Sequence, residues 1–296
     1  MRCGGLTGCR SEACHVTSTA GFGRSLTGPG PVDDLRGMHE GFDDRGFPLA
    51  WEAPPQRIVS LVPSLTETLV DLGVEEQIVG VTRFCLHPDH LRREKTRVGG
   101  TKGVKVDVIM DLRPDLVIAN LEENDAQDIM ALEIAGVPCW VCDVRSVERA
   151  FRLLSDLGDL VGQSDRGREM EEEARKAWGE VRERVNPGQG RKVAYAVWRN
   201  PWMWAGRDAY IQSVLRWWGW APWPDQSRYP ELDMDTVRQA GVEEVLLPSE
   251  PFPFKEEHRA ECGDLSSRLV DGEVFSWYGS RMLHVPASME QAASAG

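Results

Sequence analysis

"RIVSLVPSLTETLVDLG", Arg57 to Gly73, contains the clearest indication of fold class in this chain. Its first six residues are mostly apolar and include two β-branched valines and an isoleucine, which is typical of a buried strand. Pro63 and Ser64 then begin a helix that ends at Gly73, and we interpret Ser64 as the N-cap. The stretch is therefore one strand–turn–helix unit of an α/β protein.

The same alternation continues along the first half of the chain. It predicts strands over 78–82, 115–120 and 137–143, and helices over 107–113, 128–136 and 146–162. Strands that alternate with helices build a mostly parallel sheet, in which ligands bind at the carboxyl ends of the strands. We therefore predict an N-terminal α/β lobe over residues 41–163.

A long helix and a second α/β unit follow. Residues 164–187 are highly charged with few apolar positions, which favours a solvated helix that bridges two lobes. Strands are predicted over 192–198 and 242–248, with helices over 209–219 and 233–241 and a last segment over 268–283. The C-terminal lobe is assigned to 188–296. Residues 1–40 are rich in Gly and Ser, and we predict a disordered tail there.

Composition excludes several classes of function. The net charge of -13 argues against a nucleic-acid partner, and no apolar run approaches the roughly 20 residues of a membrane span. The first residues lack the apolar core of a signal peptide. We expect a cytoplasmic monomer, or a periplasmic or lipid-anchored protein if the true translation start lies upstream.

Seven cysteines do not form the dense, even pattern of a disulfide-stapled domain. Cys139 and Cys142 have CxxC spacing but lie inside the apolar run "VPCWVCDV", so we interpret them as buried strand residues. His258 and His284 are interpreted as structural or solvated side chains.

The order of these elements resembles the helical-backbone solute-binding proteins, which deliver cobalamin, haem, iron siderophores or metal ions to ABC importers. "PPQRIVSLVPSLTETL", "RPDLVIA" and "WYGSRM" carry the resemblance, which covers about residues 47–283. It implies two lobes joined by one long helix, a ligand cleft between the lobes, and an ABC-transporter permease as partner.

The resemblance also implies site residues. Phe84, Tyr229 and Trp277 fall where cobalamin-binding members carry corrin-contacting aromatics, and Trp202 falls close to another, whereas Thr101 and Asn120 replace tryptophans. Asp107 and Asp235 occupy the positions of the carboxylates that dock onto the transporter. Together with polar side chains on the same loops, the predicted ligand contacts are Ser64, Phe84, Thr101, Lys102, Asn120, Glu122, Asn124, Arg199, Trp202, Trp204, Tyr229, Trp277 and Arg281.

Seven tryptophans lie between Ala196 and Pro230, and we predict that they divide into two groups. Trp202 and Trp204 follow a strand directly and are expected to contact ligand. Trp217, Trp218 and Trp220 lie at a helix end and are expected to pack the lobe.

Three hypotheses of function follow. The leading one is a non-catalytic protein that holds a corrinoid, haem or iron chelate between two lobes and requires no cofactor. The alternative is a cytoplasmic metal receptor or metallochaperone that binds a metal ion through Cys85, His87 and Glu122. A metal-dependent enzyme on the same frame would need His87 or Glu123 as its base.

Overall fold

The computed structural model describes residues 39–185 and 190–286. A five-stranded parallel sheet, in the order β5-β4-β3-β6-β7, forms the centre of the N-terminal lobe. Its strands are β3 (Ile58–Ser60), β4 (Ile78–Val81), β5 (Thr96–Arg97), β6 (Leu116–Asn120) and β7 (Cys139–Cys142). The helices around it are α1 (Pro63–Asp71), α2 (Leu91–Glu94), α3 (Val106–Asp111), α4 (Ala126–Ile134) and α5 (Val147–Leu160), with a 3-10 turn η1 (Glu75–Gln77).

The C-terminal lobe has a second parallel sheet, in the order β10-β8-β11-β12, with β9 added antiparallel to β8. Its strands are β8 (Lys192–Trp198), β9 (Met203–Trp204), β10 (Ala221–Trp223), β11 (Glu244–Pro248) and β12 (Ser266–Val270). Its helices are α7 (Tyr210–Trp217), α8 (Met234–Gln239), α9 (Glu256–Arg259) and α10 (Gly272–Ser276), with 3-10 turns η2 (Ala260–Cys262) and η3 (Ser280–Leu283).

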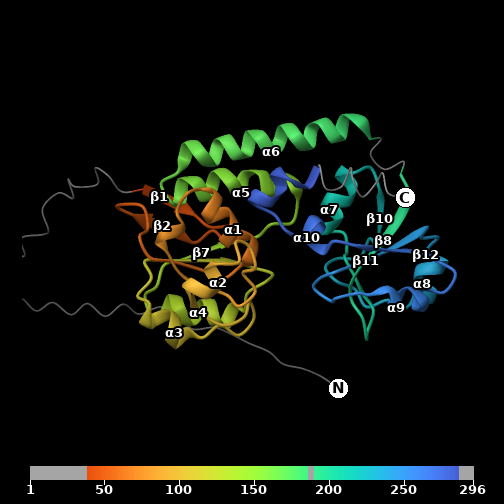
Figure 1. Ribbon diagram of the computed structural model, residues 1–296, viewed down its shortest axis with the longest axis horizontal. Helices are drawn as coiled ribbons and strands as arrows, with labels where there is room; N and C mark the ends of the chain where they lie inside the picture. Colours follow the sequence, from red (N-terminus) through yellow and green to blue (C-terminus); the bar gives the residue numbers. More distant parts are fainter. Residues whose placement is uncertain (1–38, 186–189, 287–296) are drawn as a thin grey trace, which may run out of the picture. The chain divides into compact units, whose positions relative to one another are not determined.

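The predicted α/β class with two lobes and a long helix is confirmed (Figure 1). Strands β3, β6, β7 and β11 are buried at every residue, so they read as mostly apolar runs, whereas β5 and β12 at sheet edges carry exposed residues. The antiparallel hairpin of β1 (His39–Phe42) and β2 (Pro48–Trp51) was not predicted. The predicted tail lies almost wholly outside the described residues.

The long helix α6 (Ser164–Arg184) is not the solvated bridge that its charge predicted. A stripe at helical spacing is buried: Gly167, Met170, Ala174, Trp178 and Val181. A Cβ on Gly167 would lie 2.7 Å from the carbonyl oxygen of Leu154 on α5, so the two helix backbones touch (Figure 1). Five well-spaced small or apolar residues were enough to bury one face of a helix whose other face carries the charge.

The chain crosses between the lobes a second time near its end. The segment after α10 packs on α1, where the backbone N–H of Ser280 donates to Thr68 Oγ1 at 3.0 Å. The indole N–H of Trp178 donates to the carbonyl of Met282 at 2.8 Å. The chain therefore connects the two lobes twice, once through α6 and once through this segment. Within 39–185 and 190–286, no helix has the length and apolar character of a membrane span.

Candidate functional site

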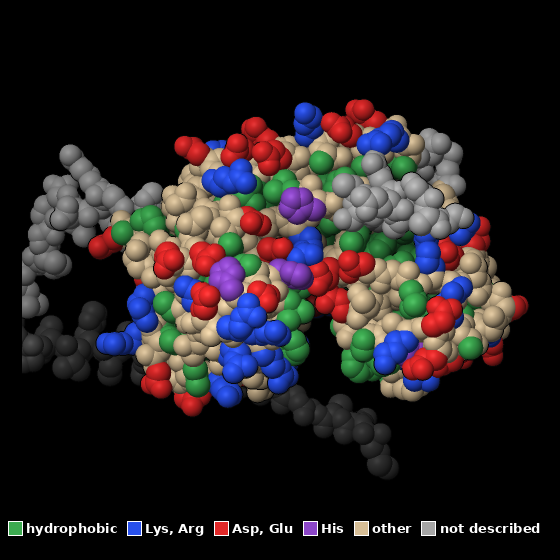
Figure 2. All heavy atoms as spheres, viewed as in Figure 1, with side chains coloured by type: hydrophobic (Ala, Val, Ile, Leu, Met, Phe, Trp, Pro, Cys, Tyr) green, Lys and Arg blue, Asp and Glu red, His purple; other side chains and the backbone are tan. Residues whose placement is uncertain are grey.

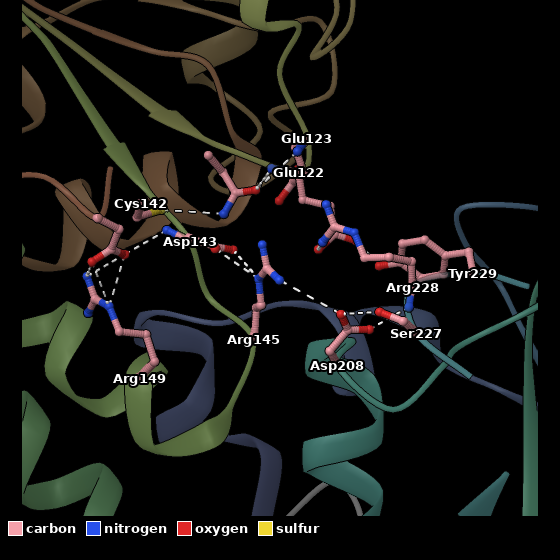
Figure 3. A network of polar contacts seen from close by, with 12 residues as sticks. Glu122, Glu123, Cys142, Asp143, Arg145, Arg149, Asp208, Ser227, Arg228 and Tyr229 are labelled. Carbon is pink, nitrogen blue, oxygen red and sulfur yellow. Dashed lines mark hydrogen bonds and ion pairs between the residues drawn. The ribbon is translucent and has the colours of Figure 1, made fainter. Parts of the chain in front are cut away.

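The loops after β6 and β7 of the N-terminal lobe meet residues 208 and 227–229 of the C-terminal lobe in one polar network, the seam between the lobes (Figure 3). Beside this network, His87 in the loop after β4 contacts Glu273 and Trp277, which follow β12. Figure 2 shows acidic, basic and histidine side chains gathered there, above a hollow in the surface between the lobes. This is the edge at which parallel sheets bind ligands.

The loop after β6 is built by two buried asparagines. Asn120 Oδ1 accepts the backbone N–H groups of Glu122 and Glu123 at 2.8 and 3.1 Å. Asn124 Oδ1 accepts the N–H of Asn120 at 2.8 Å, and its amide donates to the carbonyls of Leu61 and Thr101. Asn120 is 2% exposed and Asn124 5%. These amides satisfy backbone groups of their own loop and its neighbours, and their contact with a ligand stays a prediction.

The first carboxylate presented by this loop, Glu122, joins the two lobes. The hydroxyl of Tyr229 donates to Glu122 Oε1, and Arg228 Nη1 lies 3.8 Å from Glu122 Oε2 (Figure 3). Burial raises the pKa of Glu122, and the charge of Arg228 opposes that shift. Nearby, Arg145 pairs with Asp143 in its own lobe and, at 3.8 Å, with Asp208 in the other.

The next residue, Glu123, accepts a hydrogen bond of 2.8 Å from the hydroxyl of Tyr278. Burial of this carboxyl group raises its pKa to about 7, and the neighbouring charges of Glu122 and Glu250 act in the same direction. The seam therefore contains a carboxyl group that titrates near neutral pH.

Arg281 and Trp277 lie in the segment after α10, where the chain returns to the N-terminal lobe, and both make polar contacts there. Arg281 donates to Glu67 on α1 at 2.8 and 3.0 Å, and to Glu273 on α10 at 2.6 Å. Its guanidinium lies over the ring of Trp277, 4.7 Å from the centroid. Trp277 is 8% exposed and its indole N–H donates to Glu250 at 2.6 Å. Both side chains therefore help to join the lobes, and their contact with a ligand stays a prediction.

Cys85, His87 and Glu122 do not form the predicted metal site. Cys85 is fully buried, lies within hydrogen-bond distance of Thr66 and Thr82, and has its thiol pKa raised by burial. His87 contacts Glu273 at 3.3 Å and packs edge-on against Trp277. In the described part of the chain, no three His, Cys, Asp or Glu side chains are placed to hold a metal ion. The three residues on which the metal-receptor hypothesis rested therefore do not form a metal site.

The tryptophan predictions are partly corrected. Trp204 is fully buried and donates from its indole to the carbonyl of Leu232 at 2.8 Å, so it belongs to the core. Trp202 is stacked between Trp204 and Phe254, at 5.6 Å from each ring. Instead, Trp198 at the end of β8 is 44% exposed.

The prediction for the other tryptophan group is confirmed. Trp217 and Trp218 pack edge-on against Trp178 at 6.1 and 6.3 Å, and Trp220 stacks on Phe275 at 6.2 Å.

The remaining predicted contacts divide between the surface and the framework. Phe84 is 45% exposed after β4. Lys102 donates to the carbonyls of Glu122 and Asn124, and Arg199 pairs with Glu261 at 2.6 Å.

Thr101 is partly buried and contributes its carbonyl to the loop. Ser64 is 4% exposed inside α1, whose N-cap is Val62, so the predicted capping role is wrong. Asp107 and Asp235 are exposed in the first turns of α3 and α8, and Asp235 pairs with Arg238 at 2.7 Å.

Cys139 and Cys142 are free, buried thiols on β7, which confirms the structural interpretation. His258 is also structural, since its Nδ1 accepts the backbone N–H of Lys255 at 2.8 Å.

Residues 58–246 match the family model described as periplasmic binding protein. The chain belongs to this family. As a periplasmic binding protein, it is 27% identical over 154 residues to the vitamin B12-binding protein of Vibrio campbellii, covering 52% of this chain and 54% of the relative. It is 26% identical over 168 residues to a Bacillus subtilis protein named uncharacterized ABC transporter substrate-binding lipoprotein YvrC, covering 54% and 53%. The chain spans about half the length of the curated relatives it matches.

Solved periplasmic binding proteins share the fold. The vitamin B12-binding protein BtuF of Vibrio cholerae superposes with a TM-score of 0.71 at 18% identity, covering 82% of this chain and 98% of that one. The periplasmic heme-binding protein RhuT from Roseiflexus sp. RS-1 superposes with a TM-score of 0.70 at 18% identity, covering 80% and 97%. Their long central helix and paired sheets correspond to the architecture described above.

Proposed function

We propose that this protein is the substrate-binding component of an ABC importer and holds a metal chelate of the corrinoid, haem or iron-siderophore class between its lobes. One observation carries the proposal. Large apolar side chains are exposed where strands of both sheets end: Phe84 at 45%, Leu86 at 42% and Leu121 at 41% in the N-terminal lobe, and Trp198 at 44% in the C-terminal lobe.

Apolar side chains in such positions suit a large, flat ligand. Removing their surface from water contributes about 25 cal/mol per Å², and a chelate with two apolar faces can cover side chains of both lobes at once. The proposed ligand class is also that of the relatives, since the names of several include vitamin B12 or haem binding.

The macromolecular partner in this proposal is the permease of an ABC importer. Asp107 and Asp235 lie in corresponding places, each exposed in the first turn of a helix of its own lobe. They remain our candidates for docking onto basic side chains of a permease. We propose a periplasmic or lipid-anchored location for this protein, because its relatives include periplasmic proteins and a lipoprotein. The cytoplasmic location stays a prediction from the sequence.

Equilibrium binding of cobalamin, cobinamide, haem and ferric siderophores, followed by quenching of tryptophan fluorescence, tests the proposal. We expect micromolar or tighter binding of one class, weakened about tenfold by Phe84→Ala. Phe42→Ala is the matched control, because Phe42 is 73% exposed on the β1–β2 hairpin, which belongs to neither parallel sheet. Absence of micromolar binding to every chelate, or equal effects of the two substitutions, would contradict the proposal.

A further inference from the structure

Positive charge is concentrated in one segment of this acidic protein. Residues 83–105 contain seven Lys and Arg but only two Asp and Glu, in a chain of net charge -13. The basic residues are Arg83, Arg92, Arg93, Lys95, Arg97, Lys102 and Lys105. Figure 2 shows Lys and Arg side chains gathered on the N-terminal lobe near α2. This lobe therefore presents a local positive field beside the seam, which attracts anions.

Most cations on the strand-end loops are already neutralised. Each of five has a carboxylate partner: Lys102 with Asp125, Arg145 with Asp143, Arg199 with Glu261, Arg228 with Glu122, and Arg281 with Glu67. Arg83 differs. Among residues 39–185 and 190–286, its guanidinium has no carboxylate partner, although it follows β4 at the same edge.

The position of Arg83 is set by its neighbours. Its backbone N–H donates to the carbonyl of Gly99 at 2.8 Å, and its guanidinium lies 4.8 Å from the ring centroid of Phe84. A Cβ on Gly100 would lie 3.3 Å from the Phe84 ring and 3.5 Å from Arg83 Nη2, so this glycine leaves space for the pair. A guanidinium stacked on an aromatic ring keeps its N–H donors directed outward in the ring plane.

We propose that Arg83 is a specificity-determining residue that binds a carboxylate on the edge of the chelate whose apolar face covers Phe84. This inference rests on the proposed function and narrows it. The guanidinium supplies paired N–H donors that match a carboxylate, a geometry that an amide-edged chelate cannot use as well. The protein therefore selects carboxylate-bearing chelates over those whose edge carries only amides or esters.

Binding of haem, haem dimethyl ester and cobinamide to the full chain tests this inference. Haem carries two carboxylates, its dimethyl ester has the same ring without the charges, and cobinamide has an amide edge. We expect haem to bind at least about tenfold more tightly than either of the others, the range for one charged hydrogen-bonding group. Arg83→Gln should remove most of this preference, and Arg83→Lys should keep part of it.

Lys176→Gln is the control, because Lys176 is exposed on α6 and its loss changes the net charge equally. It should leave the preference unchanged. Two results would overturn the inference: Arg83→Gln with wild-type preference for haem, or a wild-type protein that binds cobinamide or the ester as tightly as haem. If the wild-type protein binds no metal chelate at all, the proposed function itself fails.

Discussion

The hydroxyl of Tyr278 donates a hydrogen bond of 2.8 Å to the carboxylate of Glu123, which joins the C-terminal crossing segment to the loop after β6. Because burial raises the pKa of Glu123 from the usual 4.5 to about 7, the folded protein binds a proton there that the unfolded chain has released. Stability should therefore fall as the pH rises from about 4.5 to about 7 and stay level above that.

Glu123→Gln should abolish this part of the pH dependence, since glutamine stays uncharged and its amide oxygen can accept from Tyr278. The change is at most about 3 kcal/mol between pH 5 and pH 8. Urea unfolding at both values measures it. The control is Glu76→Gln, which removes an exposed carboxylate on η1 and should keep the wild-type dependence. A wild-type pH profile in Glu123→Gln would contradict the prediction.

Arg281→Ala should destabilise the fold by about 2–3 kcal/mol, because it leaves the partly buried carboxylates of Glu67 and Glu273 without their partner. Thermal unfolding measures the loss. Arg166→Ala breaks an exposed pair with Glu169 on α6 and should cost less than about 1 kcal/mol. Equal losses of stability in the two variants would show that the Arg281 ion pairs do not stabilise the contact between the lobes.

Gly167→Ala should destabilise the protein by about 1–3 kcal/mol, although alanine is the better helix former. The new methyl group would meet Leu154 and Gly158 on α5 at 2.7 and 2.9 Å. Gly179 on the same helix has nothing within 4 Å of its Cβ position, so Gly179→Ala should stabilise by up to about 1 kcal/mol. Opposite signs in chemical denaturation are the expected result, and equal signs would refute the close packing of α5 and α6.

Trp204→Ala should cost about 3–5 kcal/mol, because it empties a fully buried indole site and removes a hydrogen bond to Leu232. Trp198→Ala should leave the free energy of unfolding within about 1 kcal/mol but weaken chelate binding. Denaturation and fluorescence-monitored binding on both variants separate the roles. If Trp204→Ala were the variant that lost binding at wild-type stability, the assignment would be reversed.

The thiols of Cys139 and Cys142 should resist thiol reagents in the native state, since burial raises the pKa of each to about 12. A variant with Ser at positions 3, 9 and 14 restricts the assay to the four buried cysteines of the described part. No reaction at pH 8 before unfolding is expected. Rapid labelling of the native protein would show that β7 opens readily.

The sequence predicted the fold more completely than the site. The strands over 115–120 and 137–143 and the helix over 146–162 match β6, β7 and α5 closely, because continuous apolar runs and helical periodicity are local signals. The helix predicted from Ser164 was found as far as Arg184, but its buried face was missed, since its buried residues are few and two of them are only Gly and Ala.

The site was predicted less well because chemistry-bearing side chains at strand ends have several possible partners. Asn120 and Asn124 were expected to face a ligand, yet they satisfy buried backbone groups of their own loop. Arg83 was not singled out, although its place directly after a strand and before an aromatic residue was a usable signal.

Local sequence patterns were sufficient to predict two α/β lobes with mostly parallel sheets, the helix between them and the loops at the strand ends. Which face of a helix or strand is buried depends on apolar residues repeated every few positions, and this spacing can be read from a single sequence. The folded arrangement was needed to show which charged groups near those loops have a carboxylate partner. Arg199 finds its carboxylate 62 residues away and Arg281 finds Glu67 214 residues away, whereas Arg83 finds none in the described part of the chain. Such pairings depend on distances in space, which no local pattern in the sequence records.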